Sequence, residues 1–313
     1  MTVPTFSDRL IKRSFVRRAG NSALNVIDRR PAPFFLAPAL LGVVLIDGIP
    51  LVYGLTISLF NQSLSNPTTS FVGLRNYGTQ LSSPSTWNSI GLSLVFTGFS
   101  VGLAFLLGMI SALLLNAPMR ARGVIRALLI IPWAVPAFVA ALIWQWMYND
   151  QFGIINSVLT DLGVHSPPLW LSSRYAMMSL IIVMVWKSFP FQMVLLLAGL
   201  QAIPDELYEA AKVDGASAWK GFVSITLPLL RPISFISVLM AAINAFQFFP
   251  IPWILTAGGP AGSTNVIPIS SYNTAFQAGQ LSQGATIATI MFIIILIGAS
   301  VYLWRYVKLM GSL

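Results

Sequence analysis

The chain has 313 residues, of which 56% are hydrophobic and only 9% are charged, and its mean hydropathy is +0.78. Soluble domains carry about a quarter charged residues, so this composition excludes an ordinary soluble protein and indicates a chain that crosses a membrane several times. The absence of cysteine excludes disulfides, thiolate metal sites and a cysteine nucleophile, and the net charge of +9 is distributed as membrane topology requires rather than as nucleic-acid binding requires.

Six apolar runs of spanning length predict an all-α membrane protein with six transmembrane helices. A basic arm, residues 1–33, precedes them, and it is either an interfacial amphipathic helix or a tail that serves only topology. The first run is too long, and follows too much polar sequence, to be a cleavable signal peptide. The expected transmembrane domain is 34–307, followed by a short tail, 308–313. The spans are expected at about 34–60, 89–117, 124–147, 175–199, 233–257 and 285–307.

The third of these spans contains Pro132 and Pro136, one helical turn apart near its start. Proline removes a backbone donor and crowds the preceding turn, so we expect these residues to bend the span. A bent helix suits a gated path, and it is equally common in passive packing.

Lysine and arginine are distributed asymmetrically between the connections. Of the 18 such residues, all but Arg75, Arg174 and Lys187 lie in four segments. These are the N-terminal arm, the connection between spans two and three, the segment between spans four and five, and the C-terminal end. The positive-inside rule places these segments in the cytoplasm, so both termini are expected there.

The segment between the fourth and fifth spans, 203–230, is polar and charged although two apolar runs flank it. It holds four of the nine acidic residues of the chain. Local signals predict a short helix over 205–213, a sharp reversal at Gly215 and a second helix over about 216–226 that leads to Pro228. A charged helix–glycine–helix element between two spans must lie on a membrane face, and we expect another protein to bind it.

This segment carries the pattern EAA-x3-G-x9-I-x-LP, which resembles the coupling loop of the membrane subunits of binding-protein-dependent ABC importers. Other stretches resemble the carbohydrate-uptake branch of that family, with its maltose-type subunits. They are FVGLRNY at 71–77, IPWAVP at 131–136, WKSFP at 186–190, AGLQ at 198–201 with Ile203-Pro204, and LTAGGP at 255–260. Together the matches extend over about residues 34 to 307.

The resemblance implies the type I ABC-importer permease fold and alternating access in the cytoplasmic (inner) membrane. The implied partners are a second permease subunit in a heterodimer, two copies of an ATP-binding subunit, and an external solute-binding protein that delivers a sugar or related polyhydroxylated solute. ATP and Mg would be bound by the ATPase, because this chain has no GxxxxGK[ST] motif and needs no cofactor or metal of its own. The residues that the resemblance assigns to ATPase coupling are Glu209, Ala210, Ala211, Asp214, Gly215, Leu227 and Pro228.

Polar side chains inside spans are costly, so each is a candidate functional residue. Lys187 lies near the middle of the fourth span, and Asn244 and Gln247 lie three residues apart in the fifth, on one helical face. The resemblance implies that the solute contacts Lys187, Ser188, Phe191, Asn244 and Gln247, with Phe248 as a neighbour. The alternative is that the two amides form interhelical hydrogen bonds. Lys187 would suit a polar or acidic group on the substrate.

Asp47 is the only acidic residue inside a span, at a depth comparable to that of Lys187. A lone buried charge is unfavourable, so the two residues are a candidate intramembrane ion pair. Alternatively, Asp47 is solvated near a helix bend at residues 48–50.

Two other classes of function are compatible with six spans. A self-contained secondary transporter or channel for a small polar solute would not need the EAA segment. A membrane-embedded enzyme would need clustered acidic, histidine or metal-binding residues, whereas His165 is the only histidine and lies in a polar loop. The sequence therefore predicts a transport subunit with no catalytic residues of its own.

Overall fold

The computed structural model describes residues 31–65 and 69–310, and the described part is almost entirely helical. The strands in this part are β1 (Phe60–Asn61) and β2 (Ser70–Phe71), which pair antiparallel with Phe60 opposite Phe71. The chain divides after Thr56 into two units. Most of the basic arm predicted at 1–33 lies outside the described residues.

One membrane-length helix runs from Leu36 to Ser58, and all of it except its last two residues lies in the first unit. It is built from α2 (Pro31–Val43), the π turn η1 (Val44–Gly48) and α3 (Ile49–Ser58). At the π turn the N–H of Ile49 donates to the carbonyl of Val44, five residues earlier. The next residue, Pro50, has no N–H to donate.

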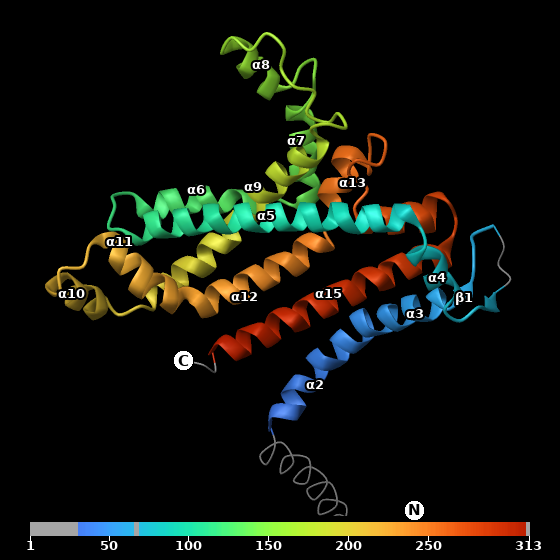
Figure 1. The fold of residues 1–313 in the computed structure, drawn as a ribbon, viewed down its shortest axis with the longest axis horizontal. Helices are drawn as coiled ribbons and strands as arrows, with labels where there is room; N and C mark the ends of the chain where they lie inside the picture. The colour runs from blue at the N-terminus through green and yellow to red at the C-terminus, as the bar shows by residue number, and fades with distance from the viewer. Residues whose placement is uncertain (1–30, 66–68, 311–313) are drawn as a thin grey trace, which may run out of the picture. The chain divides into compact units, whose positions relative to one another are not determined.

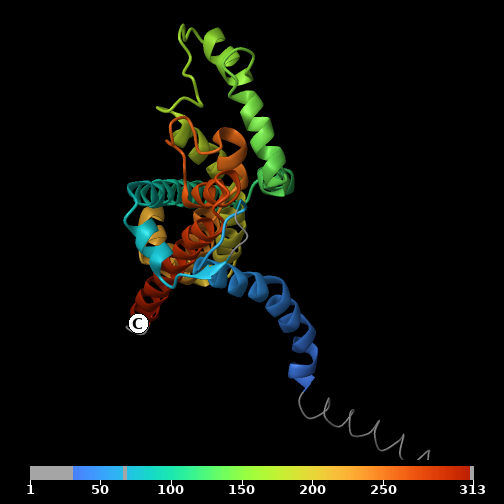
Figure 2. The same ribbon diagram turned by 90° about the vertical axis from the view of Figure 1, so that its right-hand side faces the viewer.

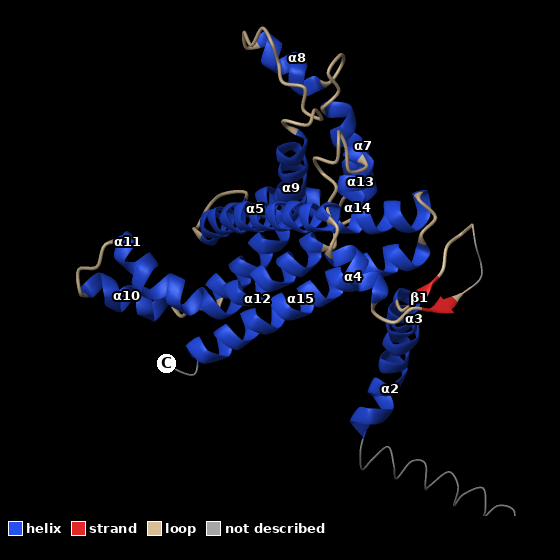
Figure 3. Ribbon diagram, turned by 45° about the vertical axis from the view of Figure 1, so that its right-hand side comes forward, coloured by secondary structure: helices blue, strands red, loops and turns tan. Residues whose placement is uncertain are grey.

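The second unit is organised around four long helices, α5 (Pro84–Asn116), α9 (Ala176–Gln201), α12 (Leu227–Phe246) and α15 (Leu281–Met310). Figure 1 shows α9 and α12 beside α5, and α15 beside α12. Figure 3 shows the short α10 and α11 at one end of this arrangement and α7 and α8 at another. The shorter elements are α4 (Arg75–Leu81), α6 (Arg122–Ala134), α7 (Ala137–Met147), α8 (Ile154–Asp161), α10 (Asp205–Val213), α11 (Ala218–Gly221), η2 (Phe222–Thr226), α13 (Pro250–Thr256), α14 (Ile267–Tyr272) and η3 (Asn273–Gln277).

The tightest helix contact joins α5 to α9 through a stripe of small residues. Ser100, Ala104, Gly108 and Ala112 follow each other at four-residue intervals on α5, and all are buried. A Cβ atom at Gly108 would lie 2.6 Å from the Cβ of Gln192 and 2.9 Å from the backbone nitrogen of Met193. Small residues at this spacing let membrane helices approach closely, and dispersion contacts then hold them together.

A second close contact joins α9 to α12 nearer the segment 203–230. A Cβ atom at Gly199 would lie 2.7 Å from Cγ2 of Ile233 and 2.9 Å from Cδ2 of Leu230. Leu230 is buried in a cluster with Met193, Leu196 and Leu200 of α9. The middle of the helix that contains α12 is therefore held against α9.

The predicted third span, 124–147, is not a single helix. It consists of α6 and α7, whose axes differ in direction by 94°. The backbone is extended at Val135 (ψ 129°) and Pro136 (ψ 139°), because proline disfavours a helical conformation in the residue before it. The bend expected from Pro132 and Pro136 is confirmed, and it is a complete break. With α6 and α7 taken as one span, the described residues contain six candidate spans.

The fifth span was predicted at 233–257, and the helices differ from this range in two respects. The membrane-length helix runs from Ala218 to Phe246, and α13 is a separate helix that begins at Pro250. Pro250 has no N–H for the carbonyl of Phe246, so α12 stops before it. At the other end the helix continues through Pro228, which directly follows the π turn η2 and Leu227.

The helix α13 packs against α7, although about a hundred residues separate them in the chain. Nε2 of Gln145 on α7 donates to the backbone carbonyl of Ile254 at 2.9 Å. Figure 2 shows this part of the chain (orange) beside the green helix that contains α7. The broken third span is thus supported by another short helix as well as by the full-length helix α9.

The close approach at Gly108 gives a test with a matched control. Gly108→Ala should lower the free energy of unfolding by about 1–3 kcal/mol, because the new methyl group must displace α9 backbone. Gly102→Ala is on the same helix, and no atom lies within 4 Å of its added Cβ. It should leave stability unchanged or raise it slightly through better helix propensity. Thermal unfolding of the purified chain in detergent measures both, and equal melting temperatures would contradict this packing.

Candidate functional site

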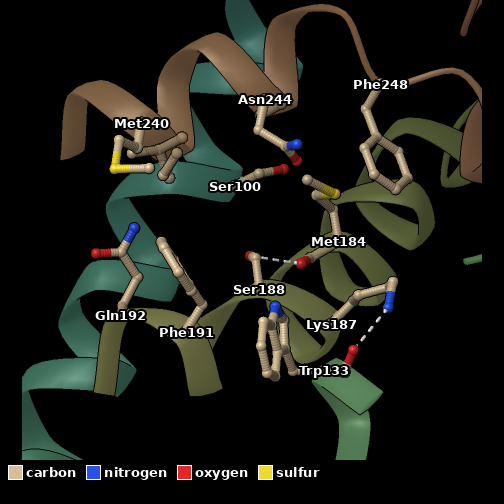
Figure 4. Close-up of a pocket in the computed structure, with 13 residues that line it drawn as sticks. Ser100, Trp133, Met184, Lys187, Ser188, Phe191, Gln192, Met240, Asn244 and Phe248 are labelled. Carbon is tan, nitrogen blue, oxygen red and sulfur yellow. Dashed lines mark hydrogen bonds between the residues drawn. The ribbon is translucent and has the colours of Figure 1, made fainter. Parts of the chain in front are cut away.

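A cavity of about 300 Å³ lies among the spans of the second unit. Figure 4 shows its lining residues, which come from α5, α9 and α12, from the end of α6 and from the loop after α12. They are Ser100, Val101, Trp133, Met184, Lys187, Ser188, Phe191, Gln192, Met240, Ala241, Asn244, Ala245 and Phe248.

Helical periodicity explains how α9 and α12 present these side chains. On α9, Lys187, Ser188, Phe191 and Gln192 occupy positions i, i+1, i+4 and i+5, which share one face. On α12, the lining residues from Met240 to Ala245 repeat the same spacing. Two helices with polar residues on their facing surfaces therefore enclose the cavity from two sides.

Five of the six residues predicted for the substrate path line this cavity: Lys187, Ser188, Phe191, Asn244 and Phe248. Gln247 does not. It follows the last residue of α12, with φ −99° and ψ 8°, and its side chain is exposed. Only Asn244 of the two amides therefore lines the cavity, and the helix that carries it ends at Phe246.

Two polar atoms in the cavity wall are buried without a hydrogen-bond partner among the described residues. They are Oγ of Ser100 and Oε1 of Gln192. Gln192 is fully buried, and its Nε2 donates to the carbonyl of Ser237 at 3.1 Å, which fixes the orientation of the amide. Both atoms have almost no exposed surface, so a solute in the cavity does not reach them. The polar lining residues that are more open are Ser188, which is half-buried, and Asn244, which is exposed.

Sequence reasoning missed Ser100, Gln192 and Trp133. Gln192 could have been found, because it lies on the same α9 face as Lys187 and Ser188 at helical spacing. Ser100 and Trp133 offered no such signal, since their place in the cavity depends on how α5 and the end of α6 pack.

The ammonium group of Lys187 contacts the C-terminal end of α6. Its Nζ donates to the carbonyl of Val135 at 2.6 Å and lies 3.4 Å and 3.5 Å from the carbonyls of Trp133 and Pro132. Trp133 also lines the cavity, and its ring stacks on that of Phe191, with centroids 6.1 Å apart and planes at 28°. Figure 4 shows Trp133 between the side chains of Lys187 and Phe191.

The candidate ion pair between Asp47 and Lys187 stays a prediction. Asp47 lies in the π turn η1 of the first unit, and Lys187 belongs to the second. What the structure adds is that backbone carbonyls already accept hydrogen bonds from Lys187.

The EAA segment folds as two short helices that meet at a glycine. The helix α10 occupies the predicted range, 205–213, with acidic residues in its first turn and Lys212 in its last, as the helix dipole favours. Gly215 has φ +73°, the left-handed conformation that glycine adopts without strain. The second predicted helix, 216–226, is α11 followed by η2, and it continues into α12 without a break.

One side of α10 is anchored and the other is exposed. Tyr208 packs on the cluster around Leu200 and Leu230, and its hydroxyl is 2.9 Å from Oγ1 of Thr226. Of the residues assigned to coupling, Ala211 and Pro228 are partly buried. Glu209, Ala210, Asp214, Gly215 and Leu227 are exposed.

Large apolar side chains near the EAA residues are also exposed. Val213 is 88% exposed and Trp219 is 72% exposed. Exposed apolar side chains on a polar segment make it a candidate protein contact site. The described residues contain no group of three or more His, Asp or Glu side chains that could hold a metal ion.

Residues 104–307 match the family described as the inner membrane component of binding-protein-dependent transport systems. The chain is 41% identical over 269 residues to the trehalose/maltose transport system permease protein MalF of Thermococcus litoralis, covering 86% of this chain and 90% of that protein. It is 34% identical over 281 residues to the sulfoquinovosyl glycerol transport system permease protein SmoG of Agrobacterium fabrum, covering 90% and 91%.

Among solved structures, the fold is similar to that of a bacterial ABC transporter involved in the import of the acidic polysaccharide alginate. The TM-score is 0.79 at 19% identity, over 92% of this chain and 99% of that one. The helices therefore have the type I ABC-importer permease arrangement. The chain is a multi-pass membrane protein and a transport subunit that catalyses no reaction itself. It belongs to the family of inner membrane components of binding-protein-dependent transport systems.

Proposed function

We propose that this subunit imports a sugar or a related polyhydroxylated solute, delivered by an external solute-binding protein. The observation that carries the proposal is the cavity, which combines aromatic rings with polar side chains. Trp133, Phe191 and Phe248 offer aromatic faces for the C–H groups of a sugar ring, while Ser188 and Asn244 offer polar groups for its hydroxyls. Binding sites of this kind are mostly apolar, with a few placed polar groups.

The relatives support the same class of solute. Their names include trehalose/maltose, sulfoquinovosyl glycerol and, for a Streptomyces coelicolor protein 34% identical over 284 residues, diacetylchitobiose. One structural neighbour was solved with a periplasmic protein bound to an alginate pentasaccharide. A sugar is the chemistry that these names share.

The proposed assembly has a second permease subunit and two copies of an ATP-binding subunit, which would hold ATP and Mg. The exposed apolar residues of the EAA segment, with the acidic residues of α10, fit an ATPase surface. The positive-inside rule places this segment and both termini in the cytoplasm. A self-contained secondary transporter is disfavoured, because it would leave Val213 and Trp219 without a partner.

The coupling role is tested at Gly215. Gly215→Pro should lower ATP-driven uptake at least roughly tenfold, because proline fixes φ near −65° and cannot adopt +73°. It also removes the hydrogen bond from the N–H of residue 215 to the carbonyl of Lys212. Glu209→Lys should have the same effect by reversing a charge on the contact surface. Uptake and ATP hydrolysis are measured on the complete importer in proteoliposomes.

Gly215→Asn is the matched control, since asparagine tolerates the left-handed conformation. It should keep most of the uptake. If Gly215→Pro retained full uptake and full stimulation of ATP hydrolysis, the segment would be a connecting loop without a coupling role.

The solute role of the cavity is tested with a pair of amides. Asn244→Ala should raise the sugar concentration that gives half-maximal uptake about tenfold, the loss expected for one or two hydrogen bonds to the solute. Gln247→Ala, three residues away and outside the cavity, should leave that concentration unchanged. Basal ATP hydrolysis should be normal in both. Equal effects of the two changes would show that the cavity is not where the solute binds.

A further inference from the structure

We propose that Trp133 is a specificity-determining residue of the cavity, that Lys187 is its positioning residue rather than a solute ligand, and that the cavity therefore selects uncharged saccharides. The inference rests on the proposed function in naming a saccharide. It departs from the expectation that Lys187 faces an acidic or polar group of the substrate.

The break between α6 and α7 creates an electrostatic need inside the membrane. The last carbonyls of any helix lack partners, and here the usual donors are missing for a definite reason. Pro136 has no N–H for the carbonyl of Pro132, and the extended backbone at residues 135–136 carries the next donors away. The N–H of Val135 still reaches the carbonyl of Ile131, at 3.2 Å, so the helix is intact up to that point.

The ammonium of Lys187 supplies the missing donors. It has three N–H groups, and three carbonyls of this break, those of Pro132, Trp133 and Val135, lie 2.6–3.5 Å from it. A cation at a helix C-terminus is also favoured by the helix dipole. The carbonyls of the break gain donors, and the ammonium of Lys187 gains the acceptors that a charged side chain inside a membrane requires.

Lys187 and Phe191 hold the same residue from two sides. They lie one turn apart on α9; Lys187 binds the backbone carbonyl of Trp133, and Phe191 stacks on its ring. The indole is still 55% exposed, on the wall of the cavity. Its position is therefore set by α9 and is available to a solute.

The charge balance of the cavity decides the class of solute. Lys187 is the only Lys, Arg, Asp or Glu among the lining residues of the described cavity, and its donors face carbonyls. A carboxylate in the cavity could pair with Lys187 only by breaking the 2.6 Å hydrogen bond from Lys187 to the carbonyl of Val135. Without that pairing it would lose its hydration and gain no partner, which is costly. A neutral sugar ring needs only the indole face and the polar side chains of Ser188 and Asn244.

The first experiment measures uptake by the complete importer in proteoliposomes, with trehalose as the solute and a disaccharide that contains glucuronic acid as competitor. Trp133→Ala should raise the half-saturating trehalose concentration about tenfold with little change in maximal rate, while Trp133→Phe should recover most of the loss. Lys187→Met should give a similar rise. The double variant should be no worse than Trp133→Ala alone, since both changes remove one interaction.

The proposal would be overturned if the effects of Trp133→Ala and Lys187→Met on the half-saturating concentration multiplied in the double variant. It would also be overturned if the acidic disaccharide competed in the wild type and Lys187→Met removed that competition, because either result would mean that Lys187 contacts solute directly. If Asp47→Asn reproduced the effects of Lys187→Met, the intramembrane ion pair would be the better account of Lys187.

A second experiment requires no sugar, and so separates this inference from the proposed function. The chain has no cysteine, so Ala134→Cys gives a single thiol beside the break. Lys187→Met should speed its reaction with a soluble maleimide severalfold, because the end of α6 loses its donors. Ala127→Cys, exposed on the same helix, should react at an unchanged rate. Unchanged labelling at residue 134 would overturn the positioning role, whereas failure of the wild-type importer to take up any saccharide would overturn only the choice of solute.

Discussion

Backbone groups inside a membrane must find hydrogen-bond partners within the protein, and the second unit is arranged around this constraint. Where prolines interrupt its helices, the chain meets the constraint in two ways. At the break after α6 it brings in a cationic side chain from α9. Near Pro228 it widens the helix by one residue, so that the N–H of Leu227 bonds to the carbonyl of Phe222, five positions back.

The same device occurs at Pro50, where a π turn also ends two residues before the proline. A proline ring collides with the carbonyl four residues earlier in a regular α-helix. A π turn placed directly before the ring changes the spacing of those carbonyls and lets the helix continue. The described spans keep their length through Pro50 and Pro228, each with a π turn before it, and α9 continues through Pro190 without one, whereas the chain turns by 94° at Pro136.

The elements that sequence could predict were those with strong local signals. The helix α10 begins and ends where Asp205 and Gly215 indicate, because its caps are short-range features. The end of α12 was misjudged because apolar composition continues through Pro250 into α13, and hydropathy does not register a change of helix. Trp133 was missed for another reason. A membrane helix is apolar on every side, so composition does not show which face is packed and which face borders a cavity.

The small-residue stripe on α5 connects the packing of α5 on α9 to the geometry of the cavity. Gly108 is in contact with Gln192, and Ser100, two turns earlier, lies in the cavity wall with it. A larger residue at position 108 would push α9 away and move the buried amide together with Lys187 and Phe191. The geometry of the cavity is therefore determined partly outside it.

The unbroken helix from Ala218 to Phe246 has a mechanical consequence. It is held near its middle, where Leu230 and Ile233 press on Gly199. About 18 Å of helix lies between Ala218 and Leu230, and about 17 Å between Ile233 and Asn244, at 1.5 Å per residue. The EAA segment and the cavity wall are thus two ends of one rigid helix, which packs on α9 between them and also on α5 and α15. Asn244 is therefore joined to the EAA segment by continuous helix, with no loop between them.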